Sequence, residues 1–137
     1  MPLVYRAMKY DEDGLPSVEP SAKGLGVRPR NDIDVDQQGN ALANGKGMSV
    51  SPSWRVLPLW RIPKRLRDKV PGAMAPDSTS CFRTGTGPFQ TGRFAQGLEL
   101  VLDSTTHGCI APAKPVPLAQ YQGDLAATRA DWRIDES

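Results

Sequence analysis

LELVLDSTTHGCIAP, residues 98–112, carries the pattern that decides the class of fold. Leu98–Leu102 is the strongest strand pattern in the chain, residues 103–106 form a polar turn, and His107–Pro112 is a further strand ended by proline. Downstream, side chains recur at helical spacing at Leu118, Tyr121, Leu125 and Trp132. This succession predicts strands followed by one C-terminal helix, and residues 135–137 are expected to fray.

Upstream of this stretch the strand patterns are shorter. Leu3–Met8 reads as a first strand, and residues 45–52 read as a glycine-led entry into a short strand that a proline stops. Residues 32–36 alternate strictly and the turn-forming residues 38–40 follow them, which predicts a hairpin that returns at residues 41–42.

Between residues 53 and 94 no periodicity persists, apart from a brief helix over residues 64–70 and a strand over residues 80–83. A segment this long without regular structure is uncommon inside a compact domain unless it is functional. We therefore expect it to hold a substrate or partner loop. The chain is predicted to be a single α+β domain over residues 1–137, with short strands, long loops and one C-terminal helix.

The composition is that of a globular protein, with 39% hydrophobic and 23% charged residues. The net charge of +2 is too small to indicate nucleic-acid binding by itself. The charge is nevertheless uneven: residues 10–36 hold seven acids and three bases, and residues 54–70 hold six bases and one acid. Such a division can steer an anionic ligand to one side of the fold, although two solvated surfaces are the commoner outcome.

Cysteine usage and hydropathy restrict the location and the cofactors. Cys81 and Cys109 follow no CxxC pattern, so no metal site is expected, while a disulfide and two free thiols both remain compatible with the sequence. No apolar run has the length of a secretory signal or of a membrane helix. We expect a cytoplasmic protein without membrane contact, and export by a machine that reads no cleavable signal stays open.

No strong catalytic motif is present, so candidate residues are judged singly. His107, the one histidine, is either a structural hydrogen-bonding residue or the base for a nucleophile such as Ser49, Ser51 or Cys81. Arg6, on the first strand, faces water, pairs with an acid or holds an anion.

Two further residue sets carry a local expectation. Ser49 and Ser51 share one face of their strand, where two hydroxyls can anchor a ribose or simply face water. Trp54, Trp60 and Trp132 are expected to pack in the core, and the basic residues around the first two also allow them to stack a base.

Three of these segments together resemble ADP-ribosyltransferase toxins. The segment HGCIAPAKP at residues 107–115 looks like the C-terminal part of the small Tse-type, NAD-dependent effector toxins of type VI secretion, where such a run precedes a terminal helix. The segments YRA at residues 5–7 and SV at residues 49–50 match the same group. The resemblance covers both ends and one central strand, and leaves residues 53–94 unsupported.

The resemblance implies a split, mixed or antiparallel sheet that holds NAD in a cleft. Tyr5 and Arg6 would bind a phosphate or ribose of NAD, and Ser49 with Ser51 would support the nicotinamide ribose. Most of these transferases place a glutamate where this chain has His107, so His107 would take that catalytic role with Ser49, and Glu99 is the reserve candidate for the acid.

The implied activity is cleavage of the nicotinamide–ribose bond, with ADP-ribose passed to an unknown macromolecular acceptor or to water. The implied partner is a neutralising immunity protein of the toxin–antitoxin kind. Two alternatives remain open: a toxin that acts on RNA through residues 54–70, although nucleic acid is not the expected partner, and a non-enzymatic interaction module.

Overall fold

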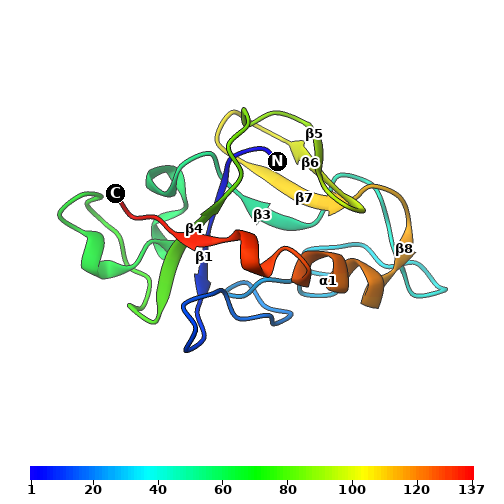
Figure 1. Cartoon of the computed structure of the whole chain (residues 1–137), viewed down its shortest axis with the longest axis horizontal. Helices are drawn as coiled ribbons and strands as arrows, with labels where there is room; N and C mark the ends of the chain where they lie inside the picture. Colours follow the sequence, from blue (N-terminus) through cyan, green and yellow to red (C-terminus); the bar gives the residue numbers. More distant parts are fainter.

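The computed structural model describes residues 1–137 and contains three small antiparallel sheets and one α-helix, which confirms the predicted α+β class (Figure 1). The largest sheet has four strands in the order β3-β7-β6-β5. Its strands are β3 (Met48–Val50), β5 (Gly92–Ala95), β6 (Leu98–Leu102) and β7 (Gly108–Pro112). The predicted strands at 98–102 and 107–112 are therefore neighbours in this sheet. Leu100 and Ile110 lie opposite each other on them, and both side chains are buried in the core.

The second sheet has three strands in the order β1-β4-β9, and the third has two. The strands of the second sheet are β1 (Val4–Lys9), β4 (Thr79–Thr84) and β9 (Arg133–Ile134). The third sheet pairs β2 (Asn40–Ala41) with β8 (Val116–Pro117). The predicted first strand and the predicted strand over residues 80–83 are thus paired with each other.

The predicted C-terminal helix begins where expected but is shorter. Helix α1 (Leu118–Ala126) is followed by a single 3-10 turn, η4 (Arg129–Asp131). Thr128 closes the helix, because its hydroxyl donates to the Leu125 carbonyl at 2.7 Å and accepts from the Trp132 indole at 3.0 Å. The helix is too short to cross a membrane, and no other helix of the chain is long and apolar enough.

The long middle segment has more regular structure than the helix over residues 64–70 and the strand over residues 80–83 that the sequence predicts. It holds β4, β5 and three 3-10 turns: η1 (Trp54–Val56), η2 (Leu59–Arg61) and η3 (Lys64–Leu66). Apolar side chains of this segment form a second core with β1, namely Trp54, Leu57, Ile62, Leu66, Ala73 and Cys81 packed with Tyr5 and Ala7. Strand β1 is consequently buried on both faces, since Val4 and Met8 enter the main core.

The hairpin predicted over residues 32–42 forms only in part. A single bridge joins Val35 to Ala41, and the turn places Gly39 at a φ of 85°. Residues 32–36 form no continuous strand, and Ala41 pairs on its other side with Val116 of β8. Cys81 and Cys109 are free thiols in separate sheets.

The C-terminal residues are docked rather than frayed, which corrects the prediction for residues 135–137 (Figure 1). Glu136 accepts from Arg65 at 2.7 Å and from the Cys81 amide at 3.0 Å. Asp135 accepts from the Tyr5 hydroxyl at 3.1 Å. The indole of Trp54 donates to the carbonyl of Ser137 at 3.1 Å. The tail therefore joins β4 to the second core.

Trp132 anchors the junction of the tail and the main core, since it is 1% exposed. We expect Trp132→Ala to lower the free energy of unfolding by about 3–5 kcal/mol, because it leaves a large cavity and removes the hydrogen bond from the indole to the Thr128 hydroxyl. Urea unfolding measures the change. Ile134→Ala, which removes a side chain 45% exposed two residues away, should change it by less than about 0.5 kcal/mol. Equal effects of the two substitutions would contradict the role of Trp132.

Asp135 makes the docking of the tail sensitive to acid. Hydrogen bonds, first from Ser137 and then from Tyr5 and Arg83, lower its pKa to about 2, against about 3.9 for an unperturbed aspartate. A lowered folded-state pKa stabilises the fold above the unfolded pKa, and that stabilisation is lost as the pH falls from about 4 to about 2. The free energy of unfolding, measured with urea at several pH values in this range, should fall more steeply with decreasing pH for the native protein than for Asp135→Asn. The same dependence on pH in both proteins would contradict this role of Asp135.

Candidate functional site

One cavity brings together Arg6, Ser49, Ser51 and His107, which lie far apart along the chain. It has a volume of about 190 Å³, and its remaining wall comes from the first 3-10 turns of the middle segment, at Leu57, Pro58, Trp60 and Arg61. We call this cavity the serine lobe. No aspartate or glutamate lines it.

Strand pairing explains why these residues meet. Beyond the end of β3, the Tyr5 amide donates to the Ser51 carbonyl at 2.7 Å, and the Ser51 amide donates back at 3.0 Å, which joins the three-stranded sheet to the four-stranded sheet. On its other side β3 pairs with β7, with Ser49 opposite Cys109. The segments at residues 5–7, 49–51 and 107–112 are therefore consecutive neighbours in space.

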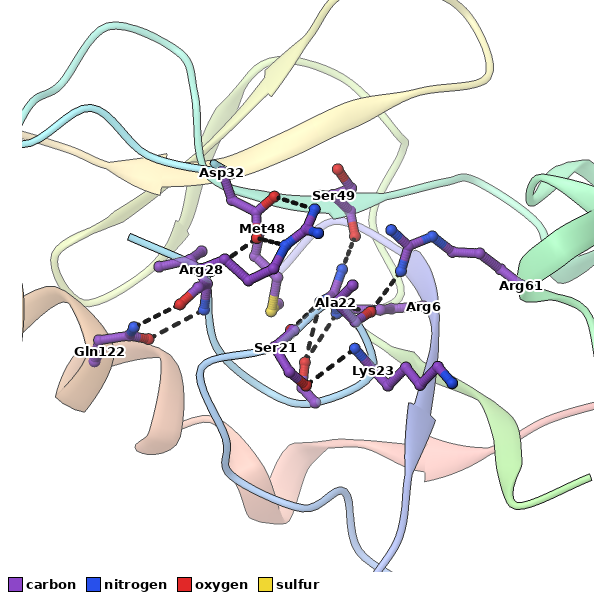
Figure 2. Close-up of polar contacts among 12 residues, drawn as sticks. Arg6, Ser21, Ala22, Lys23, Arg28, Asp32, Met48, Ser49, Arg61 and Gln122 are labelled. Carbon is purple, nitrogen blue, oxygen red and sulfur yellow. Dashed lines mark hydrogen bonds and ion pairs between the residues drawn. The ribbon is translucent and has the colours of Figure 1, made fainter. Parts of the chain in front are cut away.

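The guanidinium of Arg6 is only 3% exposed and bonds to backbone carbonyls (Figure 2). Nε and Nη2 both donate to the Gly24 carbonyl at 3.1 Å, and Nη1 donates to the Ser49 carbonyl at 2.9 Å. Nη2 also lies 3.3 Å from the carbonyls of Ser21 and Ala22. Arg6 thus ties the loop over residues 21–24 to β3, and most of its donors are used within the protein.

No carboxylate touches Arg6, so its charge is solvated by neutral dipoles alone. Burial, and then the charge of Arg61, lowers the pKa of Arg6 to about 10, which leaves it protonated at neutral pH. The nearby carboxylate of Asp32 is held by Arg28 through two side-chain hydrogen bonds of 3.1 and 2.9 Å (Figure 2). The floor of the serine lobe therefore carries a positive charge without a direct counter-ion.

His107 lies at the rim of the serine lobe and is oriented by a carboxylate. Its Nδ1 lies 2.8 Å from both oxygens of Asp103, in the turn before β7. This contact leaves Nε2 as the nitrogen that can act on a ligand. A carboxylate–imidazole pair of this kind fixes the orientation of the ring. Asp103 read as an ordinary turn residue in the sequence, since only the fold brings the turn beside the serine strand.

The two serines and Cys81 differ in burial and in their position relative to the serine lobe. Ser49 is half-buried, whereas Ser51 is 2% exposed. Burial raises the pKa of Cys81 to about 12, with a further contribution from Glu136. Cys81 belongs to the second core and does not line the serine lobe, so it forms no nucleophile–histidine pair with His107.

Tyr5 and Glu99 lie elsewhere. The Tyr5 side chain points to the opposite face of β1, into the second core, where it bonds to Asp135. Glu99 lines a separate cavity at β5 and β6, with Arg93 and Gly97. Neither residue is in a position to contact a ligand bound beside His107.

A second cavity of about 330 Å³ adjoins the serine lobe and shares Ala7, Trp60 and Arg61 with it. We call it the basic lobe, because its charged lining residues are Lys23, Arg28 and Arg61. Trp60 is 67% exposed, so the prediction that it packs in the core was wrong, whereas Trp54 and Trp132 are buried. The interleaving of tryptophan and arginine at residues 60–61 was the one signal of this lobe in the sequence.

Comparison with known proteins gives no family for this chain. No protein-family model matches it, and no curated protein shows significant sequence similarity to it. The chain also holds no group of three or more histidine, cysteine, aspartate or glutamate side chains that could bind a metal ion. The two lobes lie side by side and together form one groove, which is the candidate site.

The hydrogen bonds of Arg6 predict that a substitution at this position changes the stability of the protein. Arg6→Lys keeps a positive charge but cannot reach the carbonyls of both Gly24 and Ser49, so we expect the free energy of unfolding to fall by about 2 kcal/mol or more. Urea unfolding without any ligand measures this. Arg93→Lys, an exposed arginine on β5, is the matched control and should leave stability unchanged. An Arg6→Lys variant as stable as the control would refute the structural role.

Proposed function

We propose that this protein is an NAD-cleaving toxin of the ADP-ribosyltransferase type, which acts in the two-lobed groove. The observation that carries the proposal is the convergence of Arg6, Ser49 and His107 on one cavity, although 43 residues separate the first two and they belong to different sheets. The segments that resemble the toxin family are the ones that the bridge between Tyr5 and Ser51 and the pairing of Ser49 with Cys109 make adjacent.

The groove has the chemistry that a dinucleotide needs. The two lobes, of about 330 and 190 Å³, share a wall and together reach the size usual for ligand sites, about 300–1,000 Å³. Positive charge without lining carboxylates favours a diphosphate, and the serine strand offers hydroxyl and backbone groups to a ribose.

The proposed reaction breaks the bond between ribose C1′ and the nicotinamide nitrogen. The bonding pair leaves with nicotinamide and cancels its positive charge, while positive charge develops on the ribose. Water, or a nucleophile of the acceptor, then adds to C1′ and loses a proton. In this proposal His107, which Asp103 orients through Nδ1 and which lines the serine lobe, accepts that proton or holds a ribose hydroxyl through Nε2.

The family's usual glutamate is replaced in this scheme by the pair of His107 and Asp103. Glu99, the reserve candidate, has no part in it, because it lines a different cavity. An enzyme that consumes NAD also harms the cell that makes it. The proposal therefore includes a neutralising immunity protein and delivery into the cytoplasm of another cell, where the acceptor of ADP-ribose is found.

Trp60 favours a second candidate function, a toxin that binds RNA. An exposed indole beside Arg61 and Arg28 is a platform on which bases stack, with cations for the phosphates. Thermal unfolding separates the two, since a ligand that binds only the folded state raises the melting temperature. Stabilisation by NAD supports the first candidate, and stabilisation by short RNA alone supports the second.

The catalytic assignment predicts the effect of two substitutions. His107→Ala and Ser49→Ala should each lower the rate of nicotinamide release from NAD by about 100-fold or more, because they remove groups beside the reacting ribose. Chromatographic detection of nicotinamide measures the rate. Melting temperatures close to that of the native protein would show that the fold is kept.

Glu99→Gln is the matched control. It removes a carboxylate from the same sheet but outside the groove, so NAD cleavage should stay within about twofold of the native rate. Full activity in both groove variants, or loss of activity in Glu99→Gln alone, would overturn the assignment of His107 and Ser49.

A further inference from the structure

We propose that the basic lobe is the diphosphate subsite of the groove, with Arg61 and Lys23 as the phosphate ligands and Trp60 as the platform for an adenine ring. The inference rests on the proposed function, and it assigns the phosphates to residues other than Arg6. Arg6 lines the groove, but its guanidinium already donates hydrogen bonds to the carbonyls of Gly24 and Ser49.

The charges of the basic lobe are incompletely neutralised. Lys23, Arg28 and Arg61 line it, and no acidic residue does. Asp32, the carboxylate close to this cluster, is bound by the guanidinium and the amide of Arg28. Burial and the charge of Arg28 both lower the pKa of Arg61. An anion that enters the lobe relieves this repulsion, which is a reason for it to bind there.

The guanidinium of Arg61 is held in place before any ligand arrives. Its Nη1 donates to the Ala22 carbonyl, and the same carbonyl lies 3.3 Å from Nη2 of Arg6 (Figure 2). The Ala22 carbonyl oxygen thus accepts hydrogen bonds from both arginines, and this contact orients Arg61 over the lobe. The remaining donors of a guanidinium fixed in this way suit the paired oxygens of a phosphate.

Trp60 differs from the other two tryptophans. It is 67% exposed, against 2% for Trp54 and 1% for Trp132, and it lines both lobes. The neighbouring Leu59 and Met74 are also exposed, at 40% and 59%. An indole at the junction of two cavities, beside cations, is suited to stack on a purine whose phosphates face Arg61.

The two lobes then divide the substrate. The adenine and the diphosphate occupy the basic lobe, and the nicotinamide ribose reaches the serine lobe beside His107. Ala7, Trp60 and Arg61 line both lobes, so the two cavities lie side by side.

The test uses two probes that carry the phosphates without the nicotinamide: inorganic pyrophosphate and ADP. Both should raise the melting temperature of the native protein, and adenosine should do so far less. Arg61→Gln and Lys23→Gln should each weaken ADP binding by about tenfold, as expected for one lost charge-assisted hydrogen bond. Lys64→Gln, an exposed lysine of the same segment outside both lobes, should bind ADP like the native protein.

Trp60→Ala separates the stacking platform from the phosphate ligands. It should weaken the binding of ADP and leave that of pyrophosphate unchanged. Because Trp54 and Trp132 are buried, quenching of tryptophan fluorescence by ADP should also disappear in this variant. Arg61→Gln removes a hydrogen bond to Ala22 and can loosen the loop over residues 21–24. Lys23 and Trp60 are both exposed, so we expect Lys23→Gln and Trp60→Ala to keep the fold and to test the subsite independently.

The outcomes distinguish the subsite from the reaction. Native-like ADP binding and an unchanged KM for NAD in Lys23→Gln and Arg61→Gln would overturn the subsite, whatever the rate of cleavage. ADP binding that depends on these residues in a protein that does not cleave NAD supports the subsite and refutes the proposed reaction. Failure of pyrophosphate and ADP to stabilise the native protein would also overturn the subsite.

Discussion

The buried guanidinium of Arg6 is the constraint on which the arrangement of this protein depends. A charged group at 3% exposure must be solvated by the protein itself, and here backbone carbonyls take that task. Those carbonyls belong to the loop over residues 21–24 and to Ser49, so satisfying one side chain positions the loop and β3 relative to β1. The Ala22 carbonyl also receives Arg61, which extends the same network to the middle segment.

Strand β1 is able to hold such a residue because both of its faces are covered. Val4 and Met8 enter the main core, and Tyr5 and Ala7 enter the second core, which the middle segment builds with Trp54, Ile62 and Leu66. The turns that carry these apolar residues also form the wall of the groove at Trp60 and Arg61. The same segment therefore closes the second core and shapes the candidate site, and its many prolines suit 3-10 turns better than longer elements.

The candidate site combines fixed charge with a positioned imidazole. Arg6, Arg28 and Arg61 line the two lobes and no carboxylate does, which favours an anionic ligand. His107 adds an imidazole, and Asp103 orients that ring through a contact at Nδ1. The absence of a lining carboxylate separates this groove from the usual glutamate-based site of the toxins that the sequence resembles, and it makes the pair of His107 and Asp103 central to the proposed chemistry.

Local pattern in the sequence determined the strands at residues 4–9, 48–50, 98–102 and 108–112 and the start of the helix at Leu118, because alternation and helical spacing need no distant partner. Only the tertiary structure decided the course of residues 53–94, the docking of Asp135 and Glu136, the exposure of Trp60 and the burial of Arg6. Each of these depends on groups far away in the chain: Glu136 needs Arg65, and Arg6 needs the carbonyls of Gly24 and Ser49. Burial of a charge is a property of what surrounds it, and no periodicity along the chain encodes that.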